Sequence, residues 1–154
     1  MLEELERLVD EIGALHSKLI LLLGAPGTGK TALLYALAKR REAVPLSVGA
    51  SLSGRLAALP QKQRPMQTST ILRELADQHA KGDLLLLDNI EILFDRTLQL
   101  DPLDILKRHG RARRVVAVWP GVWRREDERL TYAEMGHPER QDYGLEGVVP
   151  FEIK

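Results

Sequence analysis

The chain has 154 residues, of which 44% are hydrophobic and 29% are charged, a balance typical of one globular domain with a substantial core. The 22 basic residues balance 22 acidic ones, so bulk charge gives no argument for nucleic-acid binding and only a local patch could provide one. The absence of cysteine excludes disulfides, thiolate catalysis and zinc-finger sites. We therefore expect a single domain over residues 1–154, with no signal peptide and no membrane span.

The first segment carries apolar side chains at helical spacing between acidic ones. This pattern predicts an amphipathic helix within residues 1–16, ending near Gly13 or His16. A stripe of leucines more often packs on a sheet than docks a partner, so we favour a structural role for it.

A phosphate-binding loop follows an apolar run over residues 19–23, which predicts a buried strand. The pattern is G-x-x-x-x-G-K-[ST] between a strand and a helix, and its residues are Gly24, Ala25, Pro26, Gly27, Thr28, Gly29, Lys30 and Thr31. Its glycines let successive N–H groups turn around a phosphate, and the helix start adds its positive dipole end. We expect Lys30 to reach the β- and γ-phosphates of ATP and Thr31 to ligate Mg²⁺. A simple glycine turn would not need both of these residues.

The helix that begins in the loop should run to about Arg41. A short strand is expected over residues 44–48, a helix over 52–59, a proline-bounded loop over 60–65 and a further helix over 68–79. An unbroken apolar run over residues 84–87 then predicts a central parallel strand, and it ends in Asp88. Beside a phosphate loop, this is the place of a Walker B aspartate that holds Mg²⁺. The alternative, an aspartate that caps the next turn, explains the pair of motifs less well.

Asn89 follows the aspartate, where many ATP-hydrolysing relatives carry a glutamate. An amide can orient a water but cannot accept its proton. Glu91 lies close enough in sequence to take that catalytic part, although a solvated loop residue explains it equally well. We therefore expect slow ATP hydrolysis, or none without a partner.

Basic residues cluster between a helix expected to open at Asp101 and a strand expected over residues 114–119. A solvated helix end is the default explanation. Arg111, Arg113 or Arg114 could instead act as an arginine finger on a neighbouring subunit's γ-phosphate, or the cluster could contact a nucleic-acid backbone. Trp119 stands where related ATPases often place a polar residue that senses phosphate, so we expect Trp119 and Trp123 to serve in packing.

The expected strands near residues 18–23, 44–48, 84–88, 114–119 and 148–153 alternate with helices. This alternation predicts an α/β phosphate-loop fold, a three-layer α/β/α sandwich with a mainly parallel five-stranded sheet. If a strand separates the two Walker strands, the order is 5-1-4-3-2, with the nucleotide at the carboxyl ends. Residues 120–147 are predicted as an irregular segment before the last strand.

Several stretches together resemble BrxF, the small phosphate-loop protein of type 3 BREX bacteriophage-defence systems: residues 24–31, 63–67, 87–95, 130–134 and 136–139. The loop is generic, whereas residues 88–94 and 132–138 are more specific. The resemblance implies a cytoplasmic protein that restricts phage with a large ATPase, a DNA methyltransferase and a phosphatase-like protein. It implies the Walker roles for Gly24–Thr31 and Asp88, and assigns none to Tyr132, Glu134 or His137.

Three functions stay open from the sequence. The first is an AAA-like ATP-binding subunit of a defence complex, as a monomer or a homo-oligomer, with DNA approached through its partners. The second is a non-hydrolysing adaptor whose shape depends on nucleotide, which Asn89 favours. The third is a small-molecule kinase, but its arginines precede a strand and are poorly placed for a lid. A GTPase is disfavoured because no Asn-Lys-x-Asp string occurs.

Overall fold

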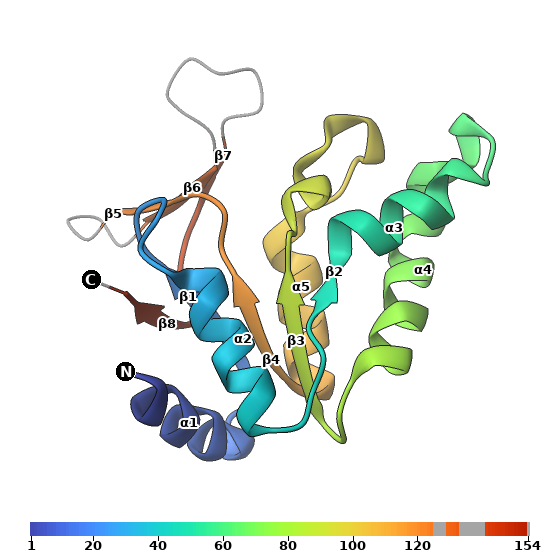
Figure 1. Cartoon of the computed structure of the whole chain (residues 1–154). Helices are drawn as coiled ribbons and strands as arrows, with labels where there is room; N and C mark the ends of the chain where they lie inside the picture. The colour runs from blue at the N-terminus through green and yellow to red at the C-terminus, as the bar shows by residue number, and fades with distance from the viewer. Residues whose placement is uncertain (125–128, 133–140, 154) are drawn as a thin grey trace.

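A computed structural model describes residues 1–124, 129–132 and 141–153 and contains one five-stranded sheet with helices on both faces (Figure 1). The strands of this main sheet are β1 (Leu19–Leu23), β2 (Leu46–Ser47), β3 (Leu84–Asp88), β4 (Arg114–Val118) and β8 (Val149–Glu152). The helices are α1 (Leu2–Glu11), α2 (Lys30–Arg40), α3 (Val48–Ala57), α4 (Arg64–His79) and α5 (Pro102–Ala112). Four 3₁₀ turns lie at Ile12–Ala14, Gln61–Gln63, Glu91–Phe94 and Arg96–Leu98 within the described residues.

The order across the main sheet is β2-β3-β4-β1-β8, and each neighbouring pair is parallel. Read from the other edge, with β8 as the fifth predicted strand, this is the predicted order 5-1-4-3-2. The three-layer α/β/α fold is therefore confirmed. Because β4 separates β1 from β3, the loop after β1 and the acidic end of β3 face each other across one strand.

All residues of β1 are buried, and successive side chains serve different layers. Leu19, Leu21 and Leu23 pack in a core with α3, α4 and α5. Ile20 and Leu22 pack in a second core with α1 and α2. A parallel strand covered on both faces needs apolar side chains in both directions, which is why the leucine runs mark the centre of the sheet.

Two helices begin earlier than the sequence predicted. α3 starts at Val48, because Val48 and Leu52 lie one helical turn apart and both are buried, so the strand expected over residues 44–48 shortens to two residues. α4 starts at Arg64, inside the predicted loop. Pro65 lies in its first turn, where a missing N–H removes no helical bond.

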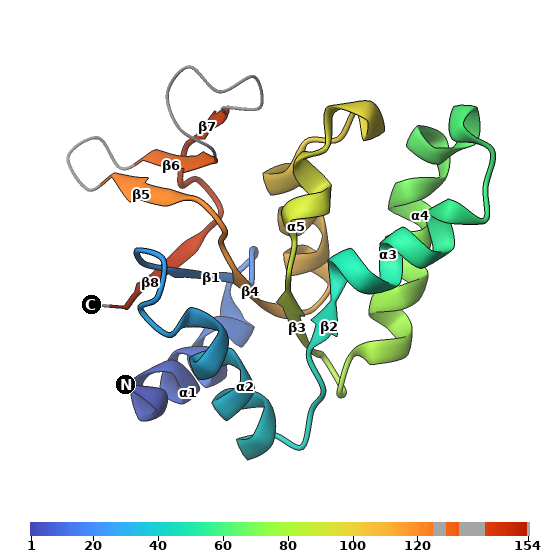
Figure 2. The ribbon, with the colours of Figure 1, turned by 45° about the horizontal axis from the view of Figure 1, so that its top comes forward.

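The segment over residues 120–147, predicted to be irregular, contains three short antiparallel strands: β5 (Val122–Arg124), β6 (Arg129–Tyr132) and β7 (Gln141–Tyr143). Each has only three or four residues, too few to give a recognisable alternating pattern in the sequence. Figures 1 and 2 show this small sheet beyond the carboxyl ends of β1 and β4, next to the loop that joins β1 to α2. None of the helices described reaches the length and hydropathy needed to cross a bilayer.

Candidate functional site

The loop between β1 and α2 has a backbone that depends on glycine at two points. Gly29 caps α2 with φ of 94°, in the left-handed region. A Cβ on Gly24 would lie 2.6 Å from the Thr28 hydroxyl oxygen and 3.0 Å from the Ile153 carbonyl oxygen. Thr28 closes the turn, since its N–H and its hydroxyl donate to the Ala25 carbonyl at 3.2 and 2.7 Å. The result is a compact loop that presents the unpaired first N–H groups of α2 to an anion.

Lys30 reaches across the loop to Trp119, the residue that follows β4. Its ammonium Nζ donates to the carbonyl oxygens of Gly24 and Trp119, at 2.9 Å each. Partial burial lowers the pKa of this ammonium, and the nearby Glu91 carboxylate acts in the opposite direction. A half-desolvated cation held by neutral carbonyls interacts more strongly with a phosphate oxygen than one surrounded by water.

Thr31 and Asp88 meet at the end of the sheet. The Thr31 hydroxyl oxygen Oγ1 lies 3.4 Å from Asp88 Oδ1. An octahedral Mg²⁺ with bonds of about 2.0–2.1 Å can bridge ligand oxygens roughly 3–4 Å apart, so the pair fits a shared ion. Across residues 1–124, 129–132 and 141–153, no group of three or more histidine or acidic side chains could hold a metal by itself. The other ligands would therefore be water and phosphate oxygens.

Asn89 ties the end of β3 to the start of α3. Its φ of 54° is left-handed, a conformation that asparagine tolerates better than most residues. The backbone N–H donates to Asp88 Oδ1 at 2.9 Å, the carbonyl accepts from Gly49 N–H at 2.8 Å, and the side-chain amide donates to the Ser47 hydroxyl at 3.3 Å. Asn89 therefore orients the Asp88 carboxylate and holds β2 beside β3.

Glu91 opens the 3₁₀ turn that follows, and its carboxylate lies close enough to interact electrostatically with Asp88 and Lys30. Although Glu91 keeps solvent exposure, partial loss of hydration raises its pKa; Asp88 raises it further, whereas Lys30 lowers it. A carboxylate with raised proton affinity beside the Walker residues has the property required of a general base. The structure thus places Glu91 within electrostatic range of Lys30 and Asp88.

An aromatic cluster supports the turn that carries Glu91. Phe94, at the other end of that turn, stacks on Tyr132 with ring centroids 4.0 Å apart and meets Trp119 edge-on at 5.4 Å. Trp119 is fully buried, as predicted, and its indole N–H donates to the Thr131 carbonyl at 3.0 Å. The sequence held no signal that would pair Phe94 with Tyr132. Glu134 and His137, whose roles the sequence left open, lie outside the described residues.

The three arginine-finger candidates lie far from this site. Arg114 starts β4 beside the start of β1, whereas the phosphate loop follows the end of β1, about 16 Å further along five strand residues. Arg114 pairs with Asp83 at 2.7 Å, and Arg113 bonds the Ala76 carbonyl and Asp77. Arg111 is exposed. None of them can serve its own subunit's phosphate loop, so an arginine finger among them stays a prediction for a neighbouring copy.

Comparison with known proteins bears on the same region. The model of one family, described as the ATPase family associated with various cellular activities (AAA), matches residues 20–117. This match runs from β1 to β4 and includes the phosphate loop, Asp88, Asn89 and Glu91. No curated protein matches the chain.

Proposed function

Because the chain belongs to the AAA family of ATPases, we propose that it binds Mg·ATP at the phosphate loop and hydrolyses it slowly on its own. The observation that carries the proposal is the convergence of Lys30, Thr31, Asp88 and Glu91 at the carboxyl edge of one parallel sheet. Ligands of open α/β sheets bind at this edge.

Each residue has a distinct part in this proposal. The loop N–H groups and Lys30 bind the β- and γ-phosphates, and Thr31 and Asp88 hold Mg²⁺, which neutralises charge on the phosphate oxygens when bound. Glu91 accepts the proton of the attacking water. Asn89 cannot do so, and its side chain is engaged with Ser47. Turnover is slow because the base lies two residues beyond the position that usually carries it.

The test is phosphate release from Mg·ATP, together with equilibrium binding of a fluorescent ATP analogue. Lys30→Ala should abolish binding, whereas Lys39→Ala, which removes an exposed charge from the other end of α2, should leave it unchanged. Glu91→Gln should keep binding and lower turnover by about 10²–10⁴-fold, the usual effect of a general base. Equal binding by the Lys30 and Lys39 variants would overturn the nucleotide site.

A non-hydrolysing adaptor is the second candidate, and the engagement of Asn89 by Ser47 favours it. In that case purified protein releases no phosphate above the Lys30→Ala background at any concentration, yet nucleotide still changes its complexes. If a neighbouring copy supplies an arginine, activity per chain instead rises with protein concentration and falls in Arg111→Ala.

For the biological setting, we propose a subunit of a BREX-type phage-defence system that acts in the cytoplasm. The support is the resemblance of residues 88–94 and 132–138 to BrxF. Its partners would be a large ATPase, a DNA methyltransferase and a phosphatase-like protein. Co-purification with these components and loss of phage protection in Lys30→Ala are the expected results. Full protection by that variant would show that nucleotide binding is incidental.

A further inference from the structure

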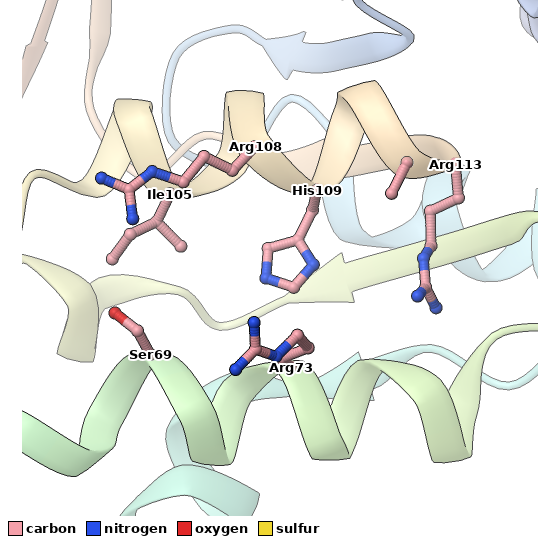
Figure 3. A pocket seen from close by; sticks show the side chains of 7 residues that line it. Ser69, Arg73, Ile105, Arg108, His109 and Arg113 are labelled. Carbon is pink, nitrogen blue, oxygen red and sulfur yellow. The ribbon is translucent and has the colours of Figure 1, made fainter.

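A cavity with several basic side chains in its lining lies between α4 and α5. The two helices lie side by side (Figure 3). The groove between them has a volume of about 210 Å³. Ser69 and Arg73 line it from α4, and Ile105, Arg108, His109, Ala112 and Arg113 line it from α5 and the residue that follows. Three arginines and a histidine therefore surround a small space, and no acidic residue described by the structure belongs to its lining.

The positive charge of this groove is only partly neutralised. Arg108 pairs with Asp104 at 2.6 Å, and Arg113 pairs with Asp77. Arg73 forms no ion pair with any residue that the structure describes, and its guanidinium points at the His109 imidazole across the groove (Figure 3). Among the described residues, the Arg73 guanidinium is thus the one in this groove that has no ion-pair partner.

Two features of the groove, loss of hydration and neighbouring cations, lower the pKa of His109. Loss of hydration is the main cause that lowers the pKa of its imidazole, and Arg113 and Arg73 lower it further, whereas Asp77 raises it. The groups around it are Arg73 and Asp77 on α4 and Arg108, Asp104 and Arg113 on the α5 side. An anion between Arg73 and His109 would oppose the repulsion and favour the imidazolium, which would then be a further donor.

We propose that the groove between α4 and α5 binds a single phosphoryl group, held by Arg73, His109 and Arg113. Guanidinium forks match phosphoryl oxygens in pairs, and the tetrahedral phosphoryl group offers oxygens to cations on several sides at once, which a planar carboxylate does not. The groove is smaller than the roughly 300–1,000 Å³ of sites for drug-sized ligands, which favours one phosphoryl group over a whole nucleotide. The group could come from free phosphate or from a nucleic-acid backbone.

The test follows the His109 imidazole by NMR in the full chain, assigned with His109→Gln. This local signal separates the groove from the phosphate loop, which also binds phosphate. Inorganic phosphate and sulfate are titrated at constant ionic strength with chloride. A saturable shift and a rise in the His109 pKa are expected. Sulfate, a dianion throughout, should bind more weakly as the pH rises and His109 loses its proton.

Arg73→Gln should lower the affinity for both anions at least about tenfold, the effect of one lost charge-assisted contact. Arg7→Gln makes the same charge change on α1, across the sheet, and should have no effect. Both arginines are exposed, so folding should be preserved. No shift with either anion, or equal affinity in the two variants, would overturn the proposal.

A short oligonucleotide tests whether the phosphoryl group comes from a nucleic-acid backbone, and a pentaglutamate peptide tests whether the groove binds carboxylates instead. If the oligonucleotide shifts the His109 signal at a concentration at least tenfold below that of phosphate, and Arg73→Gln abolishes this shift, the source is a nucleic-acid backbone. A shift by free phosphate alone supports a small phosphate ligand. A response to pentaglutamate without one to phosphate would refute the phosphoryl site, because the groove would then bind carboxylates.

Discussion

Replacement of Trp119 by phenylalanine tests how the aromatic cluster supports the fold beneath the proposed nucleotide site. The indole N–H bond to the Thr131 carbonyl is 3.0 Å long and buried, and losing it removes about 0.5–1.5 kcal/mol. The smaller ring leaves part of the site empty, at about 1 kcal/mol, well below the 3–5 kcal/mol of a tryptophan-to-alanine change. Edge-on contacts to Phe94 and Tyr143 can be partly kept. Trp119→Phe should therefore lower the free energy of unfolding by about 2 kcal/mol.

The assay is urea unfolding followed by far-UV circular dichroism. Trp123→Phe is the matched control, because Trp123 is only partly buried on β5 and should lose less than about 1 kcal/mol. The Lys30 contact uses the main-chain carbonyl of Trp119 and survives the change, so ATP-analogue affinity should alter little. A Trp119 variant within about 0.5 kcal/mol of wild type, or no less stable than the Trp123 variant, would refute this account of the cluster.

Three further predictions concern the surroundings of the site. Gly49→Ala places a Cβ 2.5 Å from the Asn89 amide nitrogen, so it should break the contact of Asn89 with Ser47 and lower ATPase activity. Its control is Gly54→Ala on the same helix, where the new Cβ meets open space. That control should stabilise the fold by up to about 1 kcal/mol, measured by thermal melts. Glu91→Gln should raise the urea midpoint at pH 7 and not at pH 4. The pKa of Glu91 is raised in the folded protein, so its charged form opposes folding only above the pKa of an unfolded glutamate, near 4.3. Because Glu91 is exposed, the change in the free energy of unfolding should stay under about 1 kcal/mol. Arg114→Gln should cost about 1 kcal/mol near neutrality. Because Arg114 lowers the pKa of Asp83, their pairing is lost when that carboxylate is protonated, so the gap from wild type should narrow as pH falls below about 4. The contact of Arg114 with the Val9 carbonyl does not depend on that charge, so a small difference should remain. An unchanged gap at pH 3 would contradict this account.

The parts of the fold that the sequence predicted are those set by local pattern. Unbroken apolar runs at residues 19–23 and 84–87 have few alternatives to central parallel strands, and the loop after the first run has a fixed relation to the next helix. From these two landmarks, the strand order follows once one strand is placed between them. The sequence alone therefore predicted that the phosphate loop and Asp88 lie at the same end of the sheet, where the structure places them.

The parts that the sequence missed depend on contacts between distant residues. β5, β6 and β7 are stabilised by packing of Tyr132 on Phe94, which lies 38 residues earlier in the chain. The sequence could not decide between a catalytic and a solvated Glu91, because its distance from Lys30 depends on how the turn after β3 folds. The groove between α4 and α5 was also missed: Arg73 and the 107–114 cluster belong to separate helices, and only the tertiary fold brings Arg73 opposite His109.

The central place of β1 also affects how the protein is made. Both strands that flank β1 come late: Leu19 pairs with Val115 in β4, and Ile20 pairs with Val149 in β8. At a synthesis rate of about 5–20 residues per second, roughly 5–20 s pass between the synthesis of β1 and that of β4, its first partner strand. Throughout that time, a run of five apolar residues on the nascent chain has unpaired backbone groups. Newly made chains therefore need early burial of this run by α1 and α2, or a chaperone on the ribosome, to escape aggregation before β4 is available.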